Sequence, residues 1–147
     1  MRLTNKSVVI TGASSGVGKG MVELFVQEGA NVVAVARREE RLNALVEELK
    51  DAPGKIEIFV GDVSQKKVNE QMIDFAIEKF GKLDVLVNNA GIVKDGLLMA
   101  MKEEDFSKVV DVNLKGTFHC IHHAARQMIR QRNGRIVNMA SVVGIQG

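Results

Sequence analysis

The sequence has 147 residues, 46% of them hydrophobic and 26% charged, so it can bury the core of one domain and is not expected to be disordered. Its formal net charge of +2 gives no electrostatic signature of a nucleic-acid partner, and no apolar run is long enough for a membrane-spanning helix. The single cysteine, Cys120, cannot form an internal disulfide, which fits a reducing compartment and makes the cytoplasm the expected location.

Short runs of β-branched residues alternate along the chain with longer amphipathic stretches, a pattern typical of strand–helix–strand units on a parallel sheet. Strands are predicted over residues 7–10, 31–35, 56–60, 85–87 and 135–139, and helices over 16–28, 39–51 and 67–80. Because several strands are nearly continuous apolar runs, helices should cover both faces of the sheet. The pattern predicts an α/β fold with a doubly wound parallel sheet that stops after its fifth strand.

A fourth and longer helix is predicted over residues 103–132, with Asn133-Gly134 as the signal that ends it. Seven apolar residues recur in it at spacings of three or four: Phe106, Val110, Leu114, Phe118, Ile121, Ala125 and Met128. Such a stripe most often packs into the core of a domain, which is the favoured interpretation here. Contact with a partner helix in an oligomer is the alternative.

A glycine-rich turn, residues 11–18, lies between the first predicted strand and the first helix. Its glycines, Gly12, Gly16 and Gly18, suit a tight turn, a close approach of a ligand to the backbone, and close packing of the helix on the strand. The free N–H groups at the start of the helix favour an anion such as a pyrophosphate. Taken alone the pattern is as typical of an ordinary turn, but its place between strand and helix favours a dinucleotide site.

The second predicted strand ends in Ala36-Arg37-Arg38. NAD enzymes commonly carry an acidic residue at this point for the ribose 2′-hydroxyl, whereas NADP requires a cation for the 2′-phosphate. Arg37 can offer a planar guanidinium to a phosphate, so NADP(H) is favoured and NAD(H) remains the alternative. The arginines could also be solvated charges at the start of a helix.

Two further loops follow predicted strands, where ligands of open parallel sheets bind. Asp62-Val63 follows the third strand, and Asp62 could accept a hydrogen bond from an adenine amino group or cap the next helix. Residues 88–91, Asn-Asn-Ala-Gly, follow the fourth strand, and their small and amide side chains suit close backbone approach to a ligand. Outside this context, residues 88–91 would be interpreted as an ordinary turn.

Five motifs occur in an order and spacing that resemble the classical short-chain dehydrogenases/reductases: Thr-Gly-x-x-x-Gly-x-Gly at 11–18, Asp62-Val63, Asn-Asn-Ala-Gly at 88–91, Val-Asn-Leu-Lys-Gly at 112–116 and Gly-Arg-Ile-Val-Asn-Met-Ala-Ser at 134–141. The resemblance covers essentially the whole chain and implies a Rossmann-type NAD(P)-binding domain over residues 1–147. Within this family, residues 94–99 and 102–106 are most similar to the 3-oxoacyl-[acyl-carrier-protein] reductases.

The resemblance implies roles for individual residues. The pyrophosphate would lie against the glycine-rich turn, the 2′-phosphate against Arg37 and Arg38, the adenine against Asp62 and Val63, and a ribose against residues 89–91. The full set implied to bind the cofactor is Gly12, Ser14, Ser15, Gly16, Val17, Gly18, Arg37, Arg38, Asp62, Val63, Asn89, Ala90 and Gly91. Ser141 would hydrogen-bond the substrate oxygen, and Asn113 would hold a water of the proton relay.

The family's Tyr-x-x-x-Lys motif would lie beyond Ser141, and the sequence contains no tyrosine. Tyrosine is the general acid of the family's reaction, so the chain is expected to be the inactive front part of a longer enzyme. That enzyme would act on a small carbonyl compound, a secondary alcohol or an acyl thioester, and would be a homodimer or homotetramer. The alternative is a catalytically inactive dinucleotide-binding module. No metal site is expected, because His119, His122 and His123 lack further ligands.

Overall fold

The computed structural model describes residues 1–146 as one parallel sheet with helices on both faces. The strands lie in the order β3-β2-β1-β4-β5. Their bounds are β1 Ser7–Thr11, β2 Asn31–Ala36, β3 Lys55–Val60, β4 Val85–Asn88 and β5 Arg135–Asn138. The helices are α1 Gly16–Gln27, α2 Glu39–Glu48, α3 Lys66–Phe80, α4 Glu103–Val109, α5 Thr117–Gln131 and α6 Val143–Gln146, with a 3-10 turn η1 at Leu98–Ala100 and a π-helical turn η2 at Val110–Gly116.

The predicted doubly wound α/β fold is confirmed, and each predicted strand lies within one residue of an observed one. All four strand pairings are parallel. Helix α2 ends at Glu48, earlier than predicted, and the segment that follows it leads into β3. The short α6 follows β5 and was not predicted.

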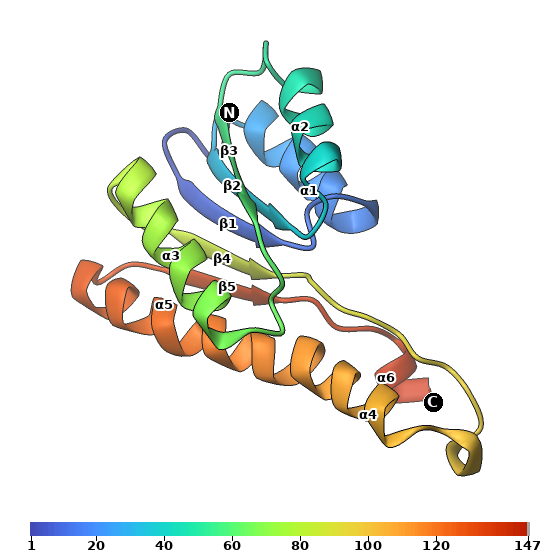
Figure 1. The fold of residues 1–147 in the computed structure, drawn as a ribbon. Coiled ribbons are helices and arrows are strands. Elements are labelled where there is room, and N and C mark those ends of the chain that lie inside the picture. Colours follow the sequence, from blue (N-terminus) through green and yellow to red (C-terminus); the bar gives the residue numbers. More distant parts are fainter. Residues whose placement is uncertain (147) are drawn as a thin grey trace.

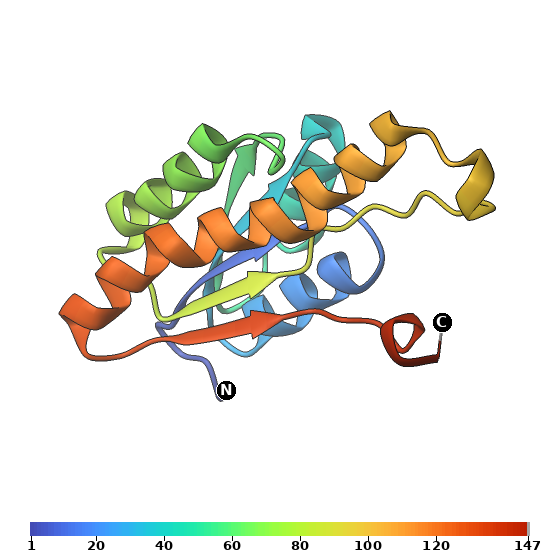
Figure 2. The same cartoon turned by 90° about the horizontal axis from the view of Figure 1, so that it is seen from below.

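Two apolar layers form the core, one on each face of the sheet, because successive side chains of a strand point to opposite faces. On one face, Val8 and Ile10 of β1 pack with α1 and α2. On the other face, Val9 of β1 packs with buried residues of α3 and α5. Figures 1 and 2 show these helix pairs on opposite sides of the sheet. In the described part of the chain, strand β5 pairs only with β4, and all four of its residues are exposed.

The predicted long helix is continuous but not uniform: α4, η2 and α5 follow one another directly, and Figure 2 shows them as one long rod. The core interpretation of its apolar stripe is wrong for Phe106, Leu114 and Phe118, which are 58%, 66% and 58% exposed. The buried positions of α5 are Cys120, Ala124 and Met128. A π-helical turn has i→i+5 hydrogen bonds, so it shifts the phase of the helix, and one 3.6-residue stripe cannot run through it.

Asp84 connects β1, β4 and β5 at the amino ends of these strands, away from the carboxyl ends that the motifs follow. Its side chain is 6% exposed and accepts hydrogen bonds from the Ser7 N–H at 2.9 Å and the Asn133 amide at 3.0 Å. The Lys82 ammonium lies 3.0 Å from the same carboxylate. Burial raises the pKa of Asp84, but the Ser7 hydrogen bond and the Lys82 charge outweigh burial and hold that pKa below its ordinary value.

Asp84→Asn is expected to lower the free energy of unfolding at pH 7 by about 1–3 kcal/mol, because the charged acceptor of several partners is lost. Since the folded-state pKa of Asp84 is lowered, its stabilisation is present above the unfolded-state pKa of about 4 and disappears as the pH falls through the folded-state value. Urea unfolding of both proteins from pH 7 to pH 3 should show the difference narrowing toward low pH. A difference that is constant over this range would contradict the role given to the carboxylate.

Candidate functional site

A cleft of about 740 Å³ lies at the carboxyl ends of β1, β2, β3 and β4. Between β1 and β4 the strand order reverses, which is where open α/β sheets bind their ligands. Nine of the predicted site residues line the cleft: Gly12, Ser14, Ser15, Arg37, Asp62, Val63, Asn89, Ala90 and Gly91. Six others do not line it: Gly16, Val17, Gly18, Arg38, Asn113 and Ser141.

Two glycines of the first turn are required by contacts inside the protein. Gly12 has a φ of +64°, and a Cβ there would lie 3.0 Å from the Ala90 Cα. A Cβ on Gly18 would overlap the carbonyl oxygen of Gly12 and crowd the Asn89 amide. These two glycines therefore bring the turn after β1 against the loop after β4.

Gly16 differs from its neighbours, because a Cβ there would meet no atom of the protein within 4 Å. Its φ of +54° is nevertheless in the left-handed region, which β-branched residues rarely adopt. The backbone at Gly16 is thus open on the side where a side chain would project. A Cβ at Gly16 would not crowd the turn itself, and backbone strain or a bound ligand would oppose a side chain there.

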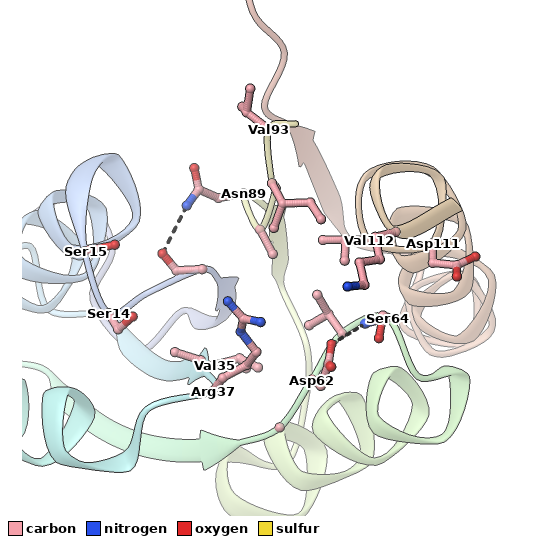
Figure 3. Close-up of a pocket in the computed structure, with 18 of the residues that line it drawn as sticks. Ser14, Ser15, Val35, Arg37, Asp62, Ser64, Asn89, Val93, Asp111 and Val112 are labelled. Carbon is pink, nitrogen blue, oxygen red and sulfur yellow. Dashed lines mark hydrogen bonds between the residues drawn. The ribbon is translucent and has the colours of Figure 1, made fainter. Parts of the chain in front are cut away.

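Thr11 connects the two loops and was not among the predicted site residues. Its hydroxyl oxygen accepts hydrogen bonds from the N–H groups of Asn89 at 3.0 Å and Ala90 at 2.9 Å. The Asn89 side-chain amide in turn donates to the Gly12 carbonyl at 3.2 Å, the dashed line beside Asn89 in Figure 3. The signal in the sequence that could have identified Thr11 is its place as a hydroxyl residue at the end of an apolar strand. The structure shows that Thr11 is buried.

Positive charge predominates among the ionisable side chains of the cleft. The cations are Arg37, Lys94 and Lys108, and the carboxylates are Asp62 and Asp111. Within residues 1–146, Lys108 and Asp111 pair with residues of their own helix, but no carboxylate lies within salt-bridge distance of Arg37. Figure 3 shows the Arg37 guanidinium extending from the end of β2 into the space between Ser14 and Asp62.

Arg37 and Arg38 have different positions. Arg38 is the residue that precedes α2 and has extended backbone angles, and its carbonyl accepts the Leu42 N–H at 3.3 Å. It is exposed and is not among the residues that line the cleft. Of the two arginines, Arg37 is the one that lines the cleft in this structure.

Asp62 has a structural contact as well as a place in the cleft. One carboxylate oxygen accepts the Ser64 N–H at 2.9 Å, which tightens the turn between β3 and α3. The residue preceding α3 is Gln65, so Asp62 does not cap the helix directly. Its second oxygen has no hydrogen-bond partner within residues 1–146, which leaves an acceptor available to a ligand.

Asn113 lies in the π-helical turn η2, and its side chain clamps the loop that follows β4. Its amide oxygen accepts the Ile92 N–H at 2.9 Å, and its amide nitrogen donates to the Ile92 carbonyl at 2.9 Å. Ile92 lines the cleft. Asn113 itself is exposed and does not line the cleft, so its contact with the cleft is through Ile92.

Ser141 is exposed and lies beyond β5, outside the cleft. Its hydroxyl oxygen accepts the Val143 N–H at 3.2 Å at the start of α6. This is the local turn contact, from a hydroxyl to the backbone two residues on, that a serine after a strand commonly makes.

Residues 1–146 contain no cluster of three or more His, Cys, Asp or Glu side chains that could hold a metal ion. None of the helices in this part of the chain combines the length and apolar character needed to span a membrane. Burial raises the pKa of the Cys120 thiol to about 12, so the thiolate required of a nucleophile is scarce at neutral pH.

Comparison with known proteins decides the family. The family model described as short chain dehydrogenase matches residues 6–147. The chain belongs to the short-chain dehydrogenase family. This short-chain dehydrogenase chain is 48% identical over 147 residues to the 3-oxoacyl-[acyl-carrier-protein] reductase FabG of Thermotoga maritima, covering 100% of this chain and 60% of that protein. It is 47% identical over 146 residues to the enzyme of the same name from Staphylococcus epidermidis, covering 97% of this chain and 59% of that protein.

Solved structures agree with this assignment. A metagenomic short-chain oxidoreductase in complex with NADP has a TM-score of 0.92 and 33% identity, over 98% of this chain and 66% of that one. Levodione reductase has a TM-score of 0.94 and 36% identity, over 99% of this chain and 58% of that one. The predicted family and its resemblance to 3-oxoacyl-[acyl-carrier-protein] reductases are confirmed. The chain spans about 60% of the length of the curated relatives that it matches.

Proposed function

We propose that the cleft binds NADP(H) and that the protein containing this chain transfers a hydride between NADP(H) and a carbonyl or secondary alcohol. The observation that carries the proposal is Arg37, a guanidinium without a salt bridge to any residue of 1–146. It enters the cleft from the end of β2, where NAD enzymes commonly have a carboxylate. The NADP complex of the metagenomic relative supports the choice of cofactor.

The residues present fit such a cofactor. The cleft volume of about 740 Å³ lies within the range of ligand sites, which is roughly 300–1,000 Å³. Gly12 and Gly16, at positive φ, turn the chain so that the first N–H groups of α1 are left for an anionic pyrophosphate. Arg37 would pair with the 2′-phosphate, Asp62 and Val63 would contact the adenine, and residues 89–91 would lie against a ribose. When bound, NADPH supplies the hydride of the reaction.

For the chemical step, Ser141 would donate a hydrogen bond to the substrate oxygen and so help to orient the reacting carbonyl. Asn113 would hold a water of the proton relay. Both groups of its amide bind Ile92, and the amide oxygen has a second lone pair for that water. These two roles remain predictions.

We further propose that residues 1–147 are the cofactor-binding part of a longer enzyme, and that a 3-oxoacyl thioester is its substrate. The similarity to enzymes named 3-oxoacyl-[acyl-carrier-protein] reductase supports the substrate class. The longer enzyme would contribute the general acid and form a homodimer or homotetramer. A dinucleotide-binding module without catalysis is the second candidate, favoured by a sequence that contains no tyrosine. The coding frame beyond residue 147 would distinguish them, because the first requires a tyrosine followed four residues later by a lysine.

Gly16→Val tests whether the cleft is a dinucleotide site. The unmodified chain is expected to bind NADPH, seen as a change in NADPH fluorescence, and Gly16→Val is expected to abolish binding. A Cβ at this position meets no atom of the protein within 4 Å, so the expected fall in the free energy of unfolding is the cost of a left-handed conformation, roughly 1–2 kcal/mol.

Gly20→Val is the control for a valine in α1, because Gly20 lies in the same helix, its Cβ position is also open, and it lies beyond the glycine-rich turn of residues 11–18. It should bind NADPH as the unmodified chain does. Binding by Gly16→Val with unchanged affinity would show that the pyrophosphate does not lie on this turn. An unmodified chain that is folded and does not bind NADPH would refute the proposed function.

A further inference from the structure

Asn69 lies near the start of α3 on the face of that helix that packs against the sheet. It is fully buried, at 0% exposure, and shares this face with Met72, Ile73 and Ala76, which are apolar. An amide at such a position is unusual, because burying it costs free energy unless its hydrogen bonds are satisfied.

Of the two polar groups of the Asn69 amide, the nitrogen has hydrogen-bond partners within residues 1–146 and the oxygen has none. Its amide nitrogen donates to the Val63 carbonyl at 2.8 Å and lies 3.4 Å from the Gly116 carbonyl. Its amide oxygen is buried and has no hydrogen-bond partner within residues 1–146. An apolar side chain at this position would avoid the free-energy cost of burying an oxygen without a partner. The contribution that only the amide makes is therefore the contact of its nitrogen with the two carbonyl groups.

These two carbonyls belong to elements that form the cleft. Val63 lines the cleft on the turn after β3. Gly116 is the last residue of η2, and a Cβ there would lie 2.8 Å from the Val63 carbonyl oxygen, so the two elements approach closely. The same turn η2 carries Asn113, which clamps Ile92 of the opposite cleft wall.

We infer that Asn69 is a positioning residue of the cofactor cleft. Through Val63 and Gly116 it holds the turn after β3 against the π-helical turn, and through Asn113 the π-helical turn holds the loop after β4. One buried amide thus sets the separation of two cleft walls without contacting the ligand. This inference rests on the proposed function, since the cleft is taken to bind NADP(H).

The test compares Asn69→Leu with Ile73→Val in the 147-residue chain. Leucine has a similar size but no donor, so Val63 and Gly116 lose their common partner. Asn69→Leu is expected to raise the Kd for NADPH about tenfold, the loss that follows when a hydrogen bond that orders a binding loop is removed. The same loss should be found with adenosine 2′,5′-bisphosphate, because Val63 lies on the adenine side. Ile73→Val perturbs the same buried face, leaves both carbonyl contacts, and should change neither Kd by more than about twofold.

Both Kd values are measured where circular dichroism shows each variant to be folded. Equal Kd values for Asn69→Leu and Ile73→Val would overturn the inference while leaving the proposed function intact, provided that the unmodified chain binds NADPH.

A second measurement needs no variant. In NMR spectra of the unmodified chain, the side-chain amide signals of Asn69 should shift when NADPH is added. Those of Asn133, which donates to Asp84 on the opposite edge of the sheet, should not shift. An Asn69 signal that does not change on saturation with NADPH would also contradict the inference.

Discussion

Arg37→Asp is expected to weaken NADPH binding on the order of 100-fold, because a charge-assisted contact is replaced by repulsion between a carboxylate and the 2′-phosphate. NADH binding should be retained or improved, since a carboxylate at this strand end can accept the ribose 2′-hydroxyl. Titration of both cofactors into the same protein would show the preference change from NADPH to NADH. An unchanged ratio of the two Kd values would contradict the place given to the 2′-phosphate.

Arg38→Asp is the matched control for this experiment. It makes the same change in charge at the next residue, outside the cleft. Its effect on NADPH binding should stay within about threefold, because water and salt screen the interaction between an exposed charge and the phosphate. Equal losses for Arg37→Asp and Arg38→Asp would mean that net charge, and not the position of one guanidinium, determines the preference.

Gly18→Ala is expected to be the most damaging single-methyl substitution in the site. The added Cβ would overlap the Gly12 carbonyl oxygen, which also accepts the Asn89 amide, so the turn after β1 and the loop after β4 must move apart. Overpacking of this kind costs roughly 1–3 kcal/mol of unfolding free energy. NADPH binding should fall on the order of 100-fold, which corresponds to about 2.8 kcal/mol of lost binding free energy.

Gly20→Ala separates this effect from a general effect of alanine in α1. Gly20 has open space at its Cβ position, so alanine there should raise the free energy of unfolding by about 0.5–1 kcal/mol through helix propensity. Fluorescence titration and urea unfolding of both variants would check the prediction. Gly18→Ala with unimpaired binding would show that the contact between the two loops does not shape the site.

The fold could be predicted from the sequence because its central strands are apolar throughout. Strands β1 and β2 are buried on both faces, and such continuous apolar runs are typical of parallel strands between two layers of helices. The carboxyl ends of all strands lie on the same side of a parallel sheet. The motifs that follow these strands were therefore expected to lie close together. The cleft residues that came from this argument, Arg37, Asp62 and Asn89 among them, do line one cleft.

The long helix was predicted less well because hydrophobic periodicity assumes a constant number of residues per turn. The π-helical turn has more residues per turn than an α-helix, and the composition of residues 110–116 does not predict it. The same turn carries Asn113, whose contact with Ile92 depends on tertiary placement. The roles of Thr11 and Asn69 were missed for a related reason, since each binds backbone groups far away in the sequence.

Lys94 and Lys108 line the cleft although the sequence did not indicate them. Lysines are common on helices and loops, and neither comes directly after a strand. Only the path of the loop after β4, which extends beyond the sheet before the chain returns through α4, brings them to the cleft (Figure 1). Ser141 shows the converse case, because its motif was clear but the structure places it outside the cleft.

Strand β1 is the first strand of the chain but lies at the centre of the sheet, and this order constrains how the sheet assembles. Its pairing with β2 closes over a single helix, whereas its pairing with β4 closes over β2, β3 and three helices. Longer loops cost more entropy to close, so the half with β1, β2 and β3 can assemble before β4 is added. The contacts of Thr11 and Gly12 with the loop after β4 form only at that later step. In that order of assembly the cleft is completed only when β4 is added, and it is lost when β4 separates from β1.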